Sequence, residues 1–214
     1  MDSKTKKITT TAMLCAIAYV MVVIGRIPVV LFLKYDPKDI IITLGGLIWG
    51  PMTSFIVSVI VSLIEMVTIS ENGPIGLIMN IVSTCSFACT ASFIYKKKRT
   101  LSGAVIGLVA GSLMMVVVML LWNYLITPIY MGYPREAVAE LLIPAFLPFN
   151  LLKAGLNAGF TFLLYKPITM ALRKAGYISD SQNMQSRKPI GLWLLAGGIV
   201  ITCILLILSF NGII

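Results

Sequence analysis

The feature that most constrains this chain is a series of apolar runs, each about as long as a helix that crosses a membrane. They cover residues 8–24, 39–69, 76–94, 103–127, 144–172 and 190–210. Proline cannot continue the hydrogen-bond ladder of a helix, so Gly50-Pro51 splits the long second run into a short second span and a third span. The sequence therefore predicts an all-α fold, a polytopic membrane helical bundle with a six-helix core and an additional C-terminal apolar helix.

The domain organisation follows from where these runs stop. Residues 1–177 are expected to form a six-span membrane domain, 178–189 a cytoplasmic polar linker, and 190–214 an extra apolar segment with the length of a seventh span. This last segment fits two arrangements, a seventh crossing helix or an accessory helix lying against the core. The sequence leaves both open.

Basic residues give the expected orientation. With the N-terminus in the cytoplasm, the inner segments hold twelve Lys and Arg residues and the outer segments hold four. Positive residues concentrate on the cytoplasmic side of membrane proteins, so this asymmetry predicts a multi-pass protein of the cell membrane with a cytoplasmic N-terminus. The net charge of +9 is explained by this topology, and no nucleic-acid partner is expected.

Several functional classes are disfavoured by residues that the chain lacks. It has no histidine, which removes a histidine general base and most zinc sites. No stretch reads GxxxxGK[ST], so no phosphate-binding loop of that type is present and energy from ATP would have to come from a partner. The four cysteines fall inside apolar runs and do not indicate a disulfide framework. We expect neither an enzyme nor a bound cofactor or metal.

Polar residues collect near the predicted outer ends of the spans. They are Asp39, Glu65, Asn80, Asn123, Asn150 and Lys153. Within PFNLLKAGLN, Asn150, Lys153 and Asn157 stand at i, i+3 and i+7, on one face of a helix. Polar groups inside a membrane usually mark a functional site, so we expect a substrate pocket that opens to the exterior. The alternative is that each side chain reaches the lipid headgroups separately.

Four segments resemble the substrate-binding S components of energy-coupling factor (ECF) vitamin transporters, in particular the riboflavin-specific branch. They are KYDPKDIIITLGGLIWGP at 34–51, GPIGLIMN at 73–80, WNYLITPIY at 122–130 and PFNLLK at 148–153. The resemblance covers about residues 8–175 and ends before the extra apolar segment.

The resemblance implies a membrane protein that takes up riboflavin from outside, with a transmembrane coupling protein and two cytoplasmic ATPases as partners. It implies substrate binding by Asn150, Lys153, Asn123 and the loop around Tyr35 and Asp39. It also implies that small residues on the first helix contact the coupling protein, and Ala12 and Ala16 match that pattern.

Three rival functions stay open. An S component for another vitamin would share the same layout. A stand-alone secondary transporter would need a coupling-ion site and paired halves, and neither is evident in the sequence. An intramembrane hydrolase would need a nucleophile with a base, for which Lys153 with Ser62 or Ser83 is the available combination.

Overall fold

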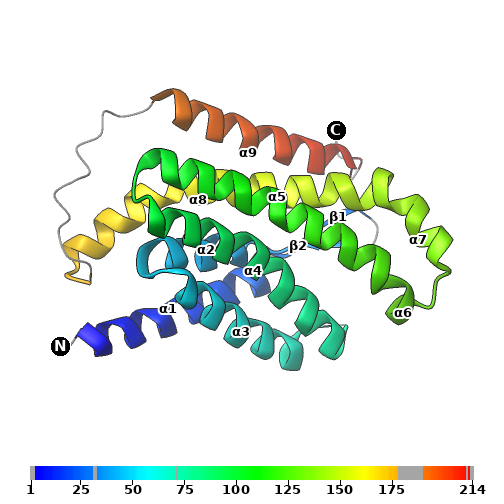
Figure 1. Cartoon of the computed structure of the whole chain (residues 1–214), viewed down its shortest axis with the longest axis horizontal. Coiled ribbons are helices and arrows are strands. Elements are labelled where there is room, and N and C mark those ends of the chain that lie inside the picture. Colours follow the sequence, from blue (N-terminus) through cyan, green and yellow to red (C-terminus); the bar gives the residue numbers. More distant parts are fainter. Residues whose placement is uncertain (1–2, 31–32, 71, 178–189, 211, 213–214) are drawn as a thin grey trace.

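The computed structural model describes residues 3–30, 33–70, 72–177, 190–210 and 212, and these form a long helical bundle (Figure 1). In chain order, the elements are α1 (Ser3–Gly25), β1 (Ile27–Val30), β2 (Leu33–Tyr35), α2 (Lys38–Trp49), α3 (Pro51–Thr68), α4 (Gly73–Lys97), α5 (Leu101–Leu125), α6 (Thr127–Met131), α7 (Arg135–Leu141), a π-helical turn η1 (Leu142–Phe146), α8 (Leu147–Lys174) and α9 (Ile190–Phe210). The predicted linker 178–189 lies outside the described residues.

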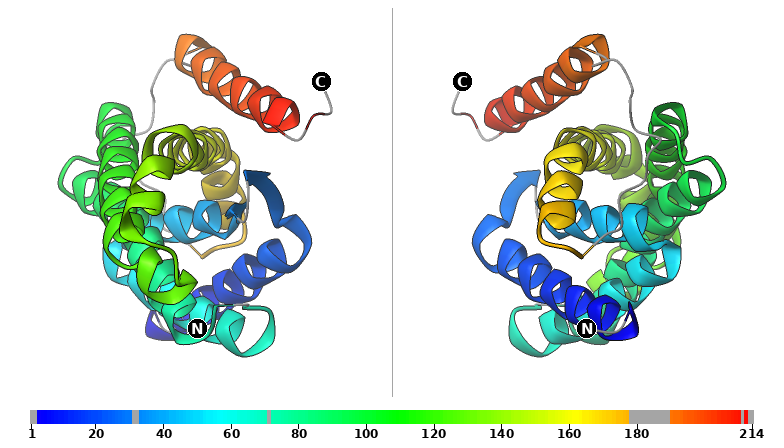
Figure 2. Two further views of the ribbon diagram at one scale, coloured as in Figure 1. Left: turned by 90° about the vertical axis from the view of Figure 1, so that its right-hand side faces the viewer. Right: turned by 90° about the vertical axis from the view of Figure 1, so that its left-hand side faces the viewer.

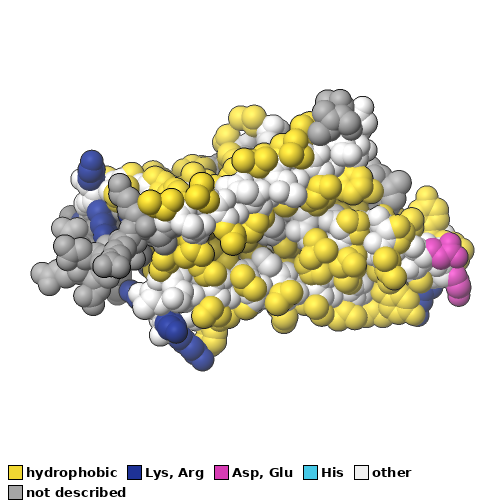
Figure 3. Space-filling model, turned by 90° about the horizontal axis from the view of Figure 1, so that it is seen from above, with side chains coloured by type: hydrophobic (Ala, Val, Ile, Leu, Met, Phe, Trp, Pro, Cys, Tyr) yellow, Lys and Arg dark blue, Asp and Glu magenta, His cyan; other side chains and the backbone are white. Residues whose placement is uncertain are grey.

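The surface of the bundle has the polarity of a membrane protein. Among the described residues, six helical stretches are long and apolar enough to cross a membrane: α1, α3, α4, α5, the continuous stretch from α7 to α8, and α9. Hydrophobic side chains cover the flank in Figure 3, whereas Lys and Arg gather at one end and Asp and Glu at the other. We call the first the basic end, defined by Lys96–Arg99, Lys166 and Arg173, and the opposite one the pocket end.

The short helix α2 lies in the interior of the bundle. It ends at Trp49 and α3 begins at Pro51, which confirms the predicted break, and Gly50 bridges them with a φ of 102°. Its 12 residues span about 18 Å, less than the ~30 Å hydrocarbon layer. A Cβ at Gly46 would lie 1.9 Å from Ser54 Oγ and 2.1 Å from Ser92 Oγ, so only glycine lets α2 approach α3 and α4 this closely.

Glycines on α5 stand four residues apart on one helix face and bring it against α4. A Cβ at Gly107 would lie 2.7 Å from the carbonyl oxygen of Ala91, and one at Gly111 would lie 2.6 Å from that of Phe87. Both contacts are with backbone, which cannot move aside as a flexible side chain can. The α4–α5 pair is therefore a rigid wall of the bundle.

The extra apolar segment forms helix α9, which lies at the periphery beside α8 (Figures 1 and 2). It packs into a glycine groove of α8, where a Cβ at Gly159 would meet Val200 Cγ2 at 2.6 Å and one at Gly155 would meet Cys203 Sγ at 3.0 Å. Further along, Cys203 and Ile207 join a core cluster with Val29 and Tyr35 of the β-strands. α9 thus touches both α8 and the β-hairpin.

Two segments that lie between the predicted spans contain regular structure. Residues 26–38 include an antiparallel hairpin in which Ile27 pairs with Tyr35 and Pro28 with Lys34. Residues 128–143 are mostly helical, in α6, α7 and the start of η1. Proline stands at the start of α6 and directly before α7, and proline is common at the start of helices. The polar composition of this segment hid that helix signal in the sequence.

Candidate functional site

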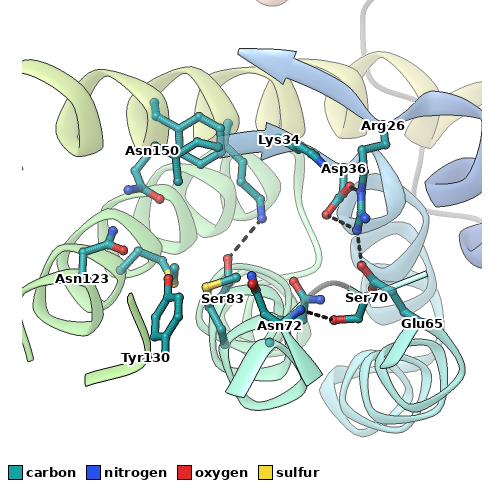
Figure 4. Close-up of a pocket in the computed structure, with 17 residues that line it drawn as sticks. Arg26, Lys34, Asp36, Glu65, Ser70, Asn72, Ser83, Asn123, Tyr130 and Asn150 are labelled. Atoms are coloured by element: carbon teal, nitrogen blue, oxygen red, sulfur yellow. Dashed lines mark hydrogen bonds and ion pairs between the residues drawn. The ribbon is translucent and has the colours of Figure 1, made fainter. Parts of the chain in front are cut away.

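A pocket opens at the pocket end, between the hairpin and the ends of five helices (Figure 4). Its walls come from the hairpin, the end of α3, the beginning of α4, the end of α5, α6 and the beginning of α8. The lining residues are Arg26, Leu33, Lys34, Asp36, Glu65, Ser70, Asn72, Gly76, Met79, Asn80, Ser83, Met119, Asn123, Tyr130, Phe149, Asn150 and Lys153. The pocket therefore combines apolar and aromatic walls with amide and charged groups.

Two buried asparagines face the pocket from one side, as Figure 4 shows for Asn123 and Asn150. Asn150 Nδ2 donates to the carbonyl oxygen of Phe146 at 2.8 Å, while its Oδ1 has no hydrogen-bond partner among the described residues. Asn123 Oδ1 accepts from Thr127 Oγ1 at 3.1 Å. A buried polar atom without a partner is rare in proteins, so Asn150 Oδ1 is a ready acceptor for a ligand donor.

The π-helical turn η1 helps to set the position of Asn150. The backbone N–H of Leu147 donates to the carbonyl of Leu142, five residues earlier, and Pro148 has no N–H to donate. Single π-turns frequently occur at functional sites because they shift the side chains that follow. Here the helix continues from α7 through η1 into α8 and carries Asn150 and Lys153 to the pocket wall.

A buried polar network centred on Asp39 supports this wall. The Asp39 carboxylate accepts from Thr84 Oγ1 at 2.6 Å and Asn157 Nδ2 at 3.2 Å, and it pairs with Lys153 Nζ at 3.3 Å. Lys153 Nζ also donates to Ser83 Oγ at 3.3 Å, and Tyr35 donates to Asn157 Oδ1 at 3.0 Å. α2, α4, α8 and β2 are thus joined by one connected set of polar contacts.

A second charged cluster closes the base of the hairpin. Arg26 Nε donates to Asp36 Oδ1 at 2.7 Å, and Arg26 also bonds to Glu65. Lys38 forms an ion pair with the other oxygen of Glu65. Burial raises the pKa of Asp36, but Lys38 and Arg26 outweigh it and hold that pKa below its ordinary value of 3.8. The two cations favour the ionised carboxylate, which keeps the hairpin tied to α3 at neutral pH.

The residues predicted from sequence to bind substrate occupy two positions. Five of them line the pocket: Glu65, Asn80, Asn123, Asn150 and Lys153. Tyr35, Asp39 and Asn157 are buried outside its lining, in the network that holds Lys153. Substrate contact by these three stays a prediction, and their observed contacts are those of positioning residues.

Several charged residues of the site were missed by sequence reasoning. Arg26, Asp36 and Lys38 were not among the predicted site residues, yet Lys38 is fully buried and Asp36 nearly so. The signal available was the alternation of basic and acidic residues in KYDPKD next to a predicted span. Charge of both signs at a membrane boundary favours pairing, but the sequence does not reveal the partner Glu65.

Ala12 and Ala16, the predicted docking pair, are exposed on α1. Cys15 and Ala18 face inward from the same helix, so the alanine pair lies on the side of α1 that packs against nothing else in the described part of the chain. A surface of small side chains allows a second helix to approach closely.

The hydrolase alternative can be assessed from Lys153 and Ser83. Their side chains are 3.3 Å apart, close enough for a Ser–Lys pair. However, Lys153 acts as a donor and as the cation of an ion pair with Asp39, whereas a general base must accept a proton. Within the described residues, no cluster of three or more His, Cys, Asp and Glu could hold a metal ion.

Comparison with known proteins relates this architecture to one family. The sequence model described as "ECF transporter, substrate-specific component" matches residues 6–165. Riboflavin transporter RibU of Staphylococcus aureus (strain TCH60) is 28% identical over 79% of this chain and 93% of its own length. Riboflavin transporter FmnP of Bacillus subtilis (strain 168) is 26% identical over 70% of this chain and 85% of its own length.

A solved structure is similar to most of the chain. This structure, reported as "Structure and mechanism of the S component of a bacterial ECF transporter", aligns with a TM-score of 0.67 at 28% sequence identity. The alignment covers 79% of this chain and 99% of the other. The family match ends at residue 165, before α9 begins.

Proposed function

This chain belongs to the family of ECF transporter substrate-specific components, and on that premise we propose that it binds riboflavin in the pocket described above. It is a multi-pass membrane protein and a transporter component rather than an enzyme. The relatives RibU and FmnP, both named as riboflavin transporters, support the choice of vitamin.

The unpartnered Oδ1 of Asn150 is the observation that carries this proposal. The pyrimidine edge of the isoalloxazine ring has one N–H between two carbonyl groups, a donor flanked by acceptors. Asn150 Oδ1 would accept from that N–H, while the Asn123 amide and Lys153 would donate to the neighbouring acceptors. Polar groups that match in this way fix the orientation of a flat ligand in a mostly apolar site.

The apolar part of the ring has matching walls. Phe149 and Tyr130 offer aromatic faces and Met119 an adaptable thioether chain, all in the pocket lining. Leu33 reaches the pocket from the hairpin, whose base is held by the Arg26 cluster. The hairpin then acts as the cover of the site, and riboflavin entry requires it to move.

The proposed transport cycle places the pocket end outside the cell and the basic end in the cytoplasm, as the distribution of Lys and Arg favours. The exposed Ala12 and Ala16 on α1 form the proposed surface for the transmembrane coupling protein. That coupling protein and two ATPases would supply the ATP-driven step.

Titration of the purified protein with riboflavin tests the binding step. Flavin fluorescence should be quenched at a 1:1 ratio, and absence of quenching at micromolar riboflavin contradicts the proposal. Uptake into proteoliposomes separates the mechanisms. Accumulation only with the coupling module and ATP supports the S-component role, whereas accumulation by this chain alone driven by an ion gradient supports a secondary transporter.

A further inference from the structure

A second cavity, with a volume of about 540 Å³, lies at the basic end and is separate from the pocket described above. Its walls come from the ends of α2 and α4, the beginning of α5, the C-terminal half of α8 and the first turns of α9. No residue lines both cavities. The family match ends at residue 165, so the α9 wall, including Trp193, lies outside the matched segment.

The mouth of this cavity is strongly cationic. Arg99, Lys166 and Arg173 line it, and none of them forms an ion pair with a described residue. The carboxylates of the described residues belong to Asp36, Asp39, Glu65, Glu136 and Glu140, in elements at the pocket end. Within the described part of the chain, no acidic side chain therefore neutralises the mouth.

Two polar atoms in the cavity wall have no hydrogen-bond partner among the residues that the structure describes. Arg173 Nε is shielded from solvent and has no hydrogen-bond partner among the described residues. Thr161, fully buried, has an unpartnered Oγ1 deeper in the same wall. Buried groups of this kind are normally satisfied, so both point to a ligand with oxygen acceptors.

The cavity wall changes from charged to polar to apolar between the mouth and the interior. From Arg173 to Thr161 the wall of α8 extends over about 18 Å at 1.5 Å per residue. Cations stand at the mouth, and the Tyr95 and Tyr165 hydroxyls, 2.8 Å apart, stand part-way in. Apolar side chains follow, among them Leu108 and the edge-to-face pair of Phe162 and Trp193. A phosphate ion would contact only the cations at the mouth. An amphiphile, with a charged head group and an apolar chain, would also contact the hydroxyls and the apolar side chains further in.

We propose that this cavity is a binding site for an anionic glycerophospholipid. Its phosphate lies near Arg99, Lys166 and Arg173, its ester oxygens lie among the Tyr95, Tyr165 and Thr161 hydroxyls, and an acyl chain packs against Phe162 and Trp193. α9 contributes the outer wall through Trp193, which gives the additional helix a role in holding lipid. The site stands on its own geometry and does not rest on riboflavin binding.

The test is the thermal unfolding midpoint of the full chain in neutral detergent with added lipid. Phosphatidylglycerol should raise the midpoint well above the effect of phosphatidylcholine, because a ligand that binds only the folded state stabilises it. The double variant Arg99→Gln/Arg173→Gln should weaken phosphatidylglycerol binding by about fivefold for each arginine removed. Lys96→Gln/Lys98→Gln is the charge-matched control at the same end, outside the cavity lining, and should keep the lipid effect.

Four results would overturn the proposal. If phosphatidylcholine raises the unfolding midpoint as much as phosphatidylglycerol does, the lipid charge plays no role. If both double variants lose the phosphatidylglycerol effect equally, the effect depends on the total charge of this end and not on the cavity. If glycerol 3-phosphate alone raises the unfolding midpoint as much as the lipid does, the cavity is a site for a free phosphate compound and not for a lipid. An unchanged affinity in Trp193→Ala places the acyl chain elsewhere. Riboflavin titration of the same samples reports separately on the other pocket, so failure of one site is distinguishable from failure of the other.

Discussion

Replacement of Asn150 by leucine should weaken riboflavin binding without destabilising the free protein. The Asn150 side chain is 1% exposed and donates one hydrogen bond to Phe146, and its Oδ1 has no partner in the described part of the chain. The variant loses a neutral hydrogen bond worth about 0.5–1.5 kcal/mol and removes an unsatisfied acceptor that costs about 1–3 kcal/mol. Leucine also has good helix propensity. We therefore expect the unfolding temperature of the free protein to stay the same or to rise.

Asn150→Leu should destabilise the complex with riboflavin, in contrast to its effect on the free protein. An N–H of riboflavin that faces leucine would be buried without an acceptor, at a cost of about 1–3 kcal/mol. This cost corresponds to a Kd about 5- to 140-fold higher, since 1.4 kcal/mol is a factor of ten. Quenching of flavin fluorescence in titrations gives the Kd, and a thermal melt of the ligand-free sample gives the stability.

Thr10→Val is the matched control for this substitution. Thr10 is buried on α1 and donates to the carbonyl oxygen of Lys6, four residues earlier, so its removal deletes the same kind of local bond far from the pocket. The control should leave the Kd unchanged. An unchanged Kd in Asn150→Leu would refute the assignment of Oδ1 as the ligand acceptor, and a large loss of stability in the free protein would refute the energetic reasoning.

Three further predictions concern the hairpin, the helix packing and the docking surface. Because Arg26 helps to hold the pKa of Asp36 below 3.8, their ion pair contributes above about pH 4 and is lost as the pH falls through the folded-state pKa. Riboflavin affinity should therefore stay constant from pH 7 down to about pH 4 and drop only at lower pH. Gly111→Leu should lower the unfolding temperature strongly, because its side chain would collide with the backbone of α4, and an unchanged melt would contradict the observed packing. Ala12→Leu/Ala16→Leu should bind riboflavin normally but abolish uptake in vesicles with the coupling module, and normal uptake would exclude this surface of α1 from docking.

Much of the fold was accessible from sequence because membrane insertion depends on local composition. The apolar runs predicted the long helices, and Gly50-Pro51 predicted the break between α2 and α3. The hairpin was missed since its four- and three-residue strands carry too little periodicity to stand out.

The candidate site was only partly accessible for a different reason. The pattern in PFNLLKAGLN placed Asn150, Lys153 and Asn157 on one face of a helix, which holds in α8. It could not separate Asn150, which lines the pocket, from Asn157, whose amide bonds to Asp39 and Tyr35. Residues on the same face of one helix can have different neighbours, because those neighbours belong to other helices.

The sequence by itself determined that this chain is a membrane helical bundle with polar groups at one end, because hydrophobicity and backbone hydrogen bonding act within each segment. Only the tertiary structure decided which polar groups face a ligand and which pair with each other. It placed Lys153 beside Asp39, joined Arg26 to Glu65 across the hairpin base, and set α9 against α8. These contacts join residues far apart in sequence, and their energies depend on distances that exist only after the helices have packed.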